Sequence, residues 1–219
     1  MTTAPEVPLC DATAMTRFHG IFREALDAAP RFVGAAPADD GDRAEFVGSY
    51  YDNVLRLLHA HHEAEDVTIY PQMVERLAEQ ADVINRVNAE HEVVLGSLEA
   101  AEQAVSAWRA DPSSETRDAA GAALATLKTI LLEHLDHEEA DVVPLIGQCI
   151  TVAEWDTMSG TAFGMFSGDK VWLAVGLIQE QMLAEENTKM EANMPPPVHD
   201  FWVNSGRTMF QDYVGELRA

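Results

Sequence analysis

The chain has 219 residues, enough to bury a large core, and 47% of them are hydrophobic. Its 37 acidic and 14 basic residues give a formal net charge of −23, which argues against nucleic acid and anionic membranes, because Lys and Arg bind both. The sequence shows no signal peptide, no apolar run near the ~20 residues of a membrane span, and only two cysteines, Cys10 and Cys149. We therefore expect a cytoplasmic protein, in which two free thiols are favoured over a bridge between Cys10 and Cys149.

Glycine and proline residues divide the first two thirds of the chain into segments with helical periodicity. The pattern predicts four long helices, at about residues 12–28, 43–69, 82–108 and 114–143. Residues 32–42 read as a loop, and residues 111–114 as a turn and helix cap. No segment alternates like a strand. We predict an all-α fold, an up-down-up-down four-helix bundle formed by residues 1–148.

Residues 149–219 are predicted to add C-terminal helices that pack on the bundle as an extension rather than as a separate domain. Thr151 and Glu154 form a capping-box pattern, which predicts the start of a short helix. Two further helices are expected at 170–186, capped by Asp169, and at 198–217. Three of the four tryptophans lie in this extension, and we expect them to be packing residues.

Two pairs of side chains share one spacing. His61 and Glu65 are four residues apart, and so are His134 and Glu138. Residues at this spacing lie on one face of a helix, so an imidazole and a carboxylate there can reach the same metal ion. In both pairs a proline follows the glutamate by six residues. The spacing predicts two metal-binding helices of the same design.

The other two long helices each carry one candidate ligand, His19 and His91. The offset from His19 to His91 is 72 residues, and the offset from His61 to His134 is 73. These offsets indicate an internal repeat of two helical hairpins, each supplying one histidine and one His-x3-Glu pair. Two bridging carboxylates and four terminal imidazoles suit a pair of iron or manganese ions.

The repeat also distinguishes neighbouring histidines. His137 has no histidine counterpart in the first copy, so His134 is predicted to point inward and His137 outward. His62 aligns with Leu135, which favours His61 as the ligand. The second helix leaves the choice open, because an apolar neighbour accompanies either histidine.

These residues resemble the hemerythrin-like family, in particular its His-His-Glu (HHE) cation-binding branch. The matching segments are residues 61–66, His-His-Glu-Ala-Glu-Asp, and residues 133–139, Glu-His-Leu-Asp-His-Glu-Glu. His19 and His91 occupy the family's single-histidine places. The resemblance covers about residues 12–147, and the extension is similar to those of larger actinobacterial members.

The resemblance implies a four-helix bundle around an oxo- or hydroxo-bridged non-heme diiron centre that meets O2, peroxide or NO. It implies two iron ions as the cofactor, with iron preferred to manganese. It would make Glu65 and Glu138 the bridging carboxylates and His19, His61, His91 and His134 the terminal ligands.

This sequence departs from the oxygen-carrying members at one helix. Those carry two histidines four residues apart on the third helix, whereas His91 has Val87 and Leu95 at that distance. Four histidines would leave more coordination positions to water, a tyrosine or a carboxylate, which favours redox turnover over reversible O2 carriage. His62 would restore the count to five. Tyr70 is expected to be a packing residue.

Three functions fit these expectations. The first is an oxidoreductase that binds and reduces O2, peroxide or NO. The second is an iron- or oxygen-responsive sensor or interaction protein, in which the extension reports the state of the centre. The third is a diiron oxidase or oxygenase with a small-molecule substrate, which no motif identifies. A homo-oligomer through the C-terminal helices is a further expectation.

Overall fold

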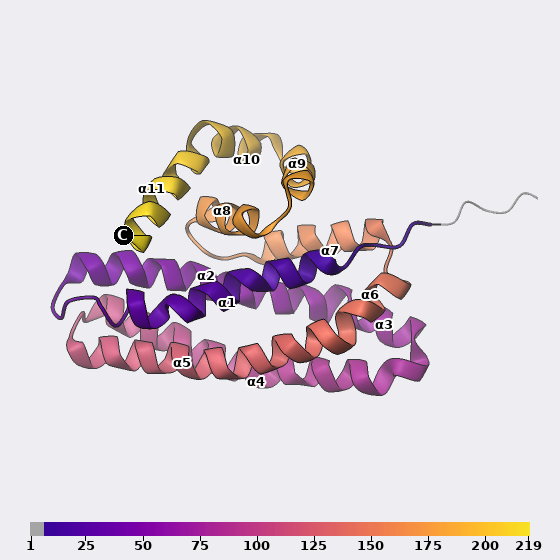
Figure 1. The fold of residues 1–219 in the computed structure, drawn as a ribbon, viewed down its shortest axis with the longest axis horizontal. Helices are drawn as coiled ribbons and strands as arrows, with labels where there is room; N and C mark the ends of the chain where they lie inside the picture. Colours follow the sequence, from indigo (N-terminus) through magenta and orange to yellow (C-terminus); the bar gives the residue numbers. More distant parts are fainter. Residues whose placement is uncertain (1–6) are drawn as a thin grey trace, which may run out of the picture.

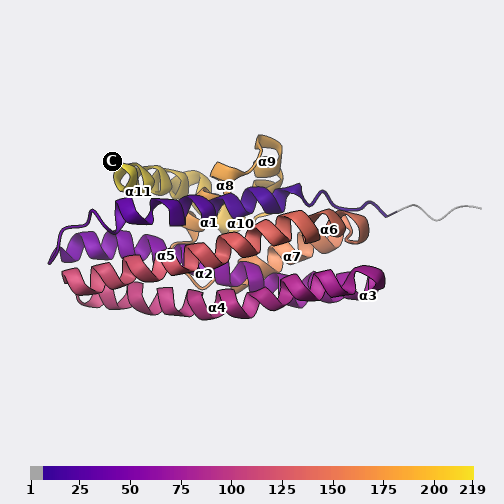
Figure 2. The same cartoon turned by 60° about the horizontal axis from the view of Figure 1, so that its bottom comes forward.

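Four long helices lie side by side and alternate in direction within residues 7–219, the part of the chain that the computed structural model describes (Figure 1, Figure 2). They are α1 (Thr13–Phe32), α2 (Gly41–Thr68), α4 (Ala81–Ala110) and α5 (Ser114–His137). Within residues 7–219 no strand forms, and Leu9 and Thr151 make an isolated antiparallel bridge. The predicted all-α bundle is confirmed.

The helix boundaries follow local capping, with one difference at α1. Asp40 caps α2 by accepting a hydrogen bond from the backbone N–H of Arg43, and Ser113 caps α5 through the N–H of Thr116. The prediction that the first helix ends near Ala28 was wrong, because α1 continues through Pro30 to Phe32. The buried Phe32 shows why: its packing in the core outweighs the proline's lost backbone hydrogen bond.

The fourth helix was predicted to end near Val143, but helical structure continues beyond it. A π-helical turn, Glu138–Val142, follows α5, and the chain continues as α6 (Val143–Cys149). Pro144 lies in the first turn of α6, where its missing N–H costs no hydrogen bond. Pro71 has the same place in α3 (Tyr70–Arg76), which follows α2, and a short 3-10 turn (Ala78–Gln80) leads into α4.

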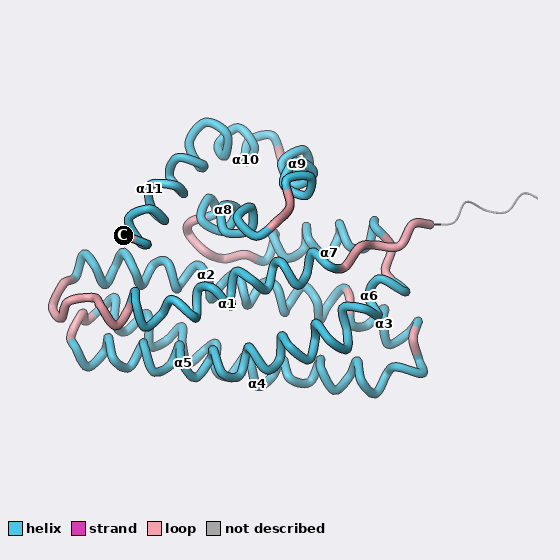
Figure 3. Tube along the Cα trace, viewed as in Figure 1, coloured by secondary structure: helices cyan, strands magenta, loops and turns pink. Residues whose placement is uncertain are grey.

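The C-terminal extension consists of short helices joined by short loops (Figure 3). They are α7 (Val152–Met165), α8 (Val171–Gln181), α9 (Ala184–Asn193), α10 (Pro196–Phe201), a π turn (Trp202–Gly206) and α11 (Arg207–Arg218). The capping box of Thr151 and Glu154 is present.

Three details of the predicted extension were wrong. The helix expected at 170–186 ends at Gln181, and α9 begins at Ala184. Asp169 does not cap α8, because its carboxylate accepts a hydrogen bond from the side-chain amide of Asn53 at 2.8 Å. The last helical segment begins at Pro196 rather than Val198.

The buried hydrophobic residues form two clusters. The larger cluster joins the bundle to α8 and α11 and includes Phe22, Leu58 and Phe210. The smaller one includes Ala64, Val87 and residues of α3 and α6. Residues 61–62 of α2 lie between Leu58 and Ala64, so a polar layer separates the clusters. Within residues 7–219, no helix is both long and apolar enough to span a bilayer.

Candidate metal centre

Seven buried polar residues form the layer between the two hydrophobic clusters. Each is at most 7% exposed. They are His19 on α1, His61, His62 and Glu65 on α2, His91 on α4, His134 on α5, and Glu138 at the start of the π turn. Six of them are the residues selected from the sequence, and His62 is the seventh.

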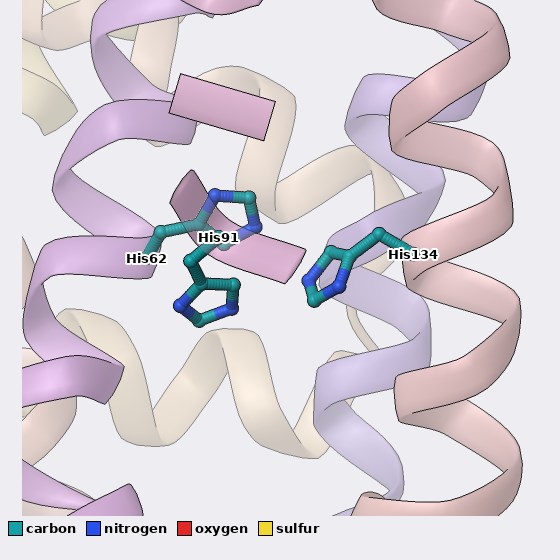
Figure 4. Close-up of side chains that lie close together, drawn as sticks. All are labelled: His62, His91 and His134. Atoms are coloured by element: carbon teal, nitrogen blue, oxygen red, sulfur yellow. The ribbon is translucent and has the colours of Figure 1, made fainter. Parts of the chain in front are cut away.

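The potential ligand atoms fall into two groups. One consists of His62, His91 and His134, and the other of His19, His61, Glu65 and Glu138; within each group these atoms lie within 4.8 Å of one another. Figure 4 shows the three imidazoles of the first group converging from different helices. Such convergence is the geometry that one metal ion needs from several helices of a bundle.

The two carboxylates of the second group also lie near histidines of the first. Glu65 places Oε1 3.4 Å from Nε2 of His61 and Oε2 4.0 Å from Nε2 of His91. Glu138 places Oε2 3.4 Å from Nε2 of His19 and 3.8 Å from Nε2 of His134. Both glutamates therefore lie within 4.0 Å of histidines from both groups.

Acidic side chains outside the layer orient three of the imidazoles. The contacts join Nδ1 of His19 to Glu139 at 2.9 Å, Nδ1 of His91 to Asp66 at 2.7 Å, and Nδ1 of His134 to Glu90 at 3.3 Å. An Nδ1–H that donates to a carboxylate leaves the Nε2 lone pair free to point inward. The sequence alone did not identify these three carboxylates.

The inward atoms fit a cation. Six buried side-chain atoms of the layer have no hydrogen-bond partner among the described residues, namely Nε2 of His62, His91 and His134, both oxygens of Glu65, and Oε2 of Glu138. A buried polar atom without a partner costs about 1–3 kcal/mol. Carboxylate oxygens and unprotonated imidazole nitrogens can only accept, so a metal ion would compensate them all.

Burial within the layer favours the neutral form of three of its imidazoles. Burial lowers the pKa of His61 and His62 well below the ordinary 6.5, and neighbouring imidazoles lower it further. For His134 the same causes lower the pKa to about 3. Burial, followed by the charge of Glu138, raises the pKa of Glu65 well above 4.5. His61, His62 and His134 are thus in the neutral form that binds metal, and Glu65 lacks a compensating positive charge.

The prediction for His137 agrees with the structure, whereas the preference for His61 over His62 does not. His137 points outward, as predicted: its side chain is 41% exposed and its Nδ1 lies 3.0 Å from Glu90. The repeat favoured His61 over His62, whereas the structure brings both into the layer. Neighbouring residues point about 100° apart on a helix. His61 and His62 can therefore both face the layer, one in each group of potential ligand atoms. The adjacent pair His61-His62 was the feature of the sequence that could have predicted two ligands on this helix.

Tyr70 has a second role besides packing. Its hydroxyl donates a hydrogen bond to Oε1 of Glu138 at 2.8 Å, and its ring lies against His91 with centroids 5.4 Å apart. The residue is 2% exposed. It therefore fixes the rotamer of one of the two carboxylates between the groups.

Tyr70→Phe is expected to weaken metal binding about 10- to 100-fold, the usual effect of losing a group that orients a ligand. The matched control is Tyr51→Phe, which also removes a buried hydroxyl but one that donates to the backbone carbonyl of Ala25, at 3.0 Å. Competition with a chelator of known affinity measures both variants. Equal affinities for the two would show that Tyr70 does not position Glu138.

The comparison with protein families agrees with this geometry. The hemerythrin HHE cation-binding domain matches residues 11–146, which include all seven residues of the layer. No curated protein and no solved structure matches the chain significantly. The matched segment is well over half of the 219 residues. With its clustered His and Glu side chains, the chain is a metal-binding protein that belongs to the hemerythrin HHE cation-binding family.

Proposed function

We propose that the layer holds two iron ions and that the protein binds and reduces O2, peroxide or NO there. One observation carries the proposal: two groups of buried ligand atoms lie side by side, both carboxylates lie near histidines of both groups, and six of the ligand atoms have no hydrogen-bond partner among the described residues. When bound, the iron pair would supply the electrons for the reduction.

Each ion would have its own set of ligands. His62, His91 and His134 would hold one ion, His19 and His61 would hold the other, and Glu65 and Glu138 would contact both. The ion with two histidines has one protein ligand fewer, so we assign the small ligand to that side. With His62 the set has five histidines, and the number of histidines no longer argues against O2 carriage.

The surroundings of His61 suit a small apolar ligand. The rings of Phe18 and Phe22 lie 4.9 and 5.8 Å from its imidazole, centroid to centroid. Phe22 is fully buried. These rings exclude water from the side that has fewer protein ligands, which strengthens electrostatic interactions there and limits side reactions.

Metal analysis of the purified protein, combined with its visible spectrum, tests the proposal. We expect two irons per chain and a ligand-to-iron absorption band that shifts when peroxide, O2 or NO is added. Single-turnover experiments with the reduced protein then separate reduction of the ligand from reversible binding. A protein that takes up no stoichiometric iron would overturn the proposal.

His62→Leu is expected to lower the iron content from two ions to one, since it removes one of three histidines around that ion. His137→Leu is the matched control, because His137 lies on the outer side of α5 and should leave the iron content unchanged. Iron per chain and the visible spectrum are measured for both. A His62→Leu protein with two irons and an unaltered spectrum would remove His62 from the proposed ligand set.

A second candidate function is sensing, favoured by contacts between the extension and α1. Arg17, two residues before His19, forms an ion pair with Glu186 of α9, with Nε and Oε2 3.1 Å apart. A side chain added at Gly20 would meet Gln181 of α8. The extension thus contacts α1 both before and after His19, a proposed metal ligand, in the sequence. Identical proteolysis of the extension in iron-free, reduced and oxidised protein would exclude this function.

A further inference from the structure

A cleft of about 670 Å³ opens between the bundle and the extension, away from the metal layer. Its walls come from α1, α2, α8 and the last turn of α11, which lie together in Figure 1. None of the seven residues of the layer lines it. Its volume falls within the range of about 300–1,000 Å³ that is common for small-molecule sites.

The floor of the cleft is apolar and has one hydroxyl. Ile21, Phe32 and Leu177 line it and are buried. Tyr50 is 5% exposed, and its hydroxyl forms no hydrogen bond with any described residue. Burial raises the pKa of Tyr50 well above its ordinary value, so the hydroxyl keeps its proton. The floor therefore offers an apolar surface and one free hydrogen-bond donor.

Most charges at the rim are already compensated. Glu180 and Arg218 form a two-point ion pair with distances of 2.8 and 2.7 Å. Asp27 pairs with Lys128 of α5 at 2.6 Å. These four side chains leave no net charge for a ligand.

Two opposite charges remain at the rim. Glu24 and Arg31 line the cleft, and neither has an ionic partner within 4.0 Å among residues 7–219. The guanidinium of Arg31 lies over the ring of Phe32, 4.6 Å from its centroid. Both residues are on α1, seven positions apart, so they lie on one face with Cα atoms about 10 Å apart. The cleft thus has one free anion and one free cation on either side of an apolar floor.

We propose that this cleft binds a small zwitterion with an apolar middle, of about the size of a dipeptide. Glu24 binds its ammonium group, Arg31 binds its carboxylate, and the floor receives the apolar part. An organic acid or an amine alone would leave one rim charge unpaired, whereas a zwitterion satisfies both. The proposal does not depend on the proposed function, because the cleft and the metal layer share no residue.

Calorimetric titration of the full-length protein with leucylphenylalanine tests the proposal. We expect saturable binding of the free dipeptide. Its N-acetyl form, which lacks the ammonium, and its C-terminal amide, which lacks the carboxylate, should each bind about tenfold more weakly, as expected for the loss of one charge-assisted contact. No binding of the free dipeptide, or equal binding of all three forms, would overturn the proposal.

Two variants assign the contacts. Arg31→Gln should remove the preference for the free carboxylate and keep the preference for the ammonium, and Glu24→Gln should do the reverse. Arg43→Gln is the matched control for Arg31, since Arg43 also stacks on a phenylalanine, Phe46, at 5.4 Å but lies outside the cleft. Glu99→Gln is the corresponding control for Glu24. Variants that keep both preferences would place the binding elsewhere and contradict the proposal.

Discussion

Replacing Glu65 by glutamine should stabilise the metal-free protein at neutral pH and remove most of its metal affinity. Glu65 is fully buried, and both of its oxygens lack a partner among the described residues. In the metal-free protein its negative charge is a cost, which a neutral amide of the same shape avoids. We expect a gain of about 1–3 kcal/mol in the free energy of unfolding, because a buried charge without a partner costs more than a buried neutral amide.

The pH dependence of that gain follows from the pKa of Glu65, which burial and Glu138 raise well above 4.5. A raised folded-state pKa means that the stabilisation by the protonated form is complete below pH 4.5 and is lost as the pH rises through the folded-state value. The glutamine variant imitates the protonated form. Its advantage over the wild-type protein should therefore be absent below pH 4.5 and grow at higher pH.

Urea unfolding of chelator-treated protein from pH 4 to 8 measures this difference, and metal titration measures the affinity. We expect the affinity to fall by more than about 100-fold, because loss of a group that only orients a ligand already costs about 10- to 100-fold. Glu63→Gln, at an exposed position of the same helix, is the control. Intact affinity would show that Glu65 is not a ligand, and a less stable metal-free variant would contradict the predicted cost of its buried charge.

Gly176→Val should displace α11 from its packing against α8. A Cβ atom at Gly176 would lie 2.2 Å from Cδ2 and 2.3 Å from Cγ of the Phe210 ring. Phe210 belongs to the cluster that joins α11 to the bundle, so its ring cannot move without breaking other contacts. We expect a loss of about 1–3 kcal/mol, as for other overpacked cores. For a chain of this size, that lowers the Tm by roughly 2–12 °C.

Gly215→Val is the matched control, since a Cβ atom at Gly215 meets nothing within 4 Å. It should change stability by less than about 0.5 kcal/mol. Thermal unfolding and the rate of proteolysis within α11 are measured for both variants, together with the iron content, which should stay unchanged. Equal effects of the two substitutions would mean that the contact between Gly176 and Phe210 does not hold α11 in place.

The sequence predicted the site better than it predicted the boundaries. The repeat of His19, His61, His91 and His134 was sufficient to select side chains that the fold brings together, because a helical period and a repeat offset fix their faces. The repeat did not select His62, because the alignment of the two copies pairs it with Leu135. Such an alignment compares residue types only and does not show that two adjacent residues can both face the polar layer.

The differences elsewhere come from contacts between distant segments. The break between α8 and α9 has no proline or glycine to mark it. Leu183 is the N-cap of α9, and its backbone N–H donates to Glu186, whose carboxylate is paired with Arg17 of α1. The π turn after α5 likewise satisfies its own backbone, so its composition gives no signal, although such turns often occur at functional sites.

The polar layer between the two hydrophobic clusters affects how cooperatively the bundle folds. Apolar burial, which usually makes a bundle fold as one unit, is interrupted there by seven polar side chains. Metal–ligand bonds would supply the missing cohesion between the halves. Metal binding would then tighten the contact between the two halves as well as fill the site, so that the metal-bound protein would unfold more cooperatively than the metal-free protein.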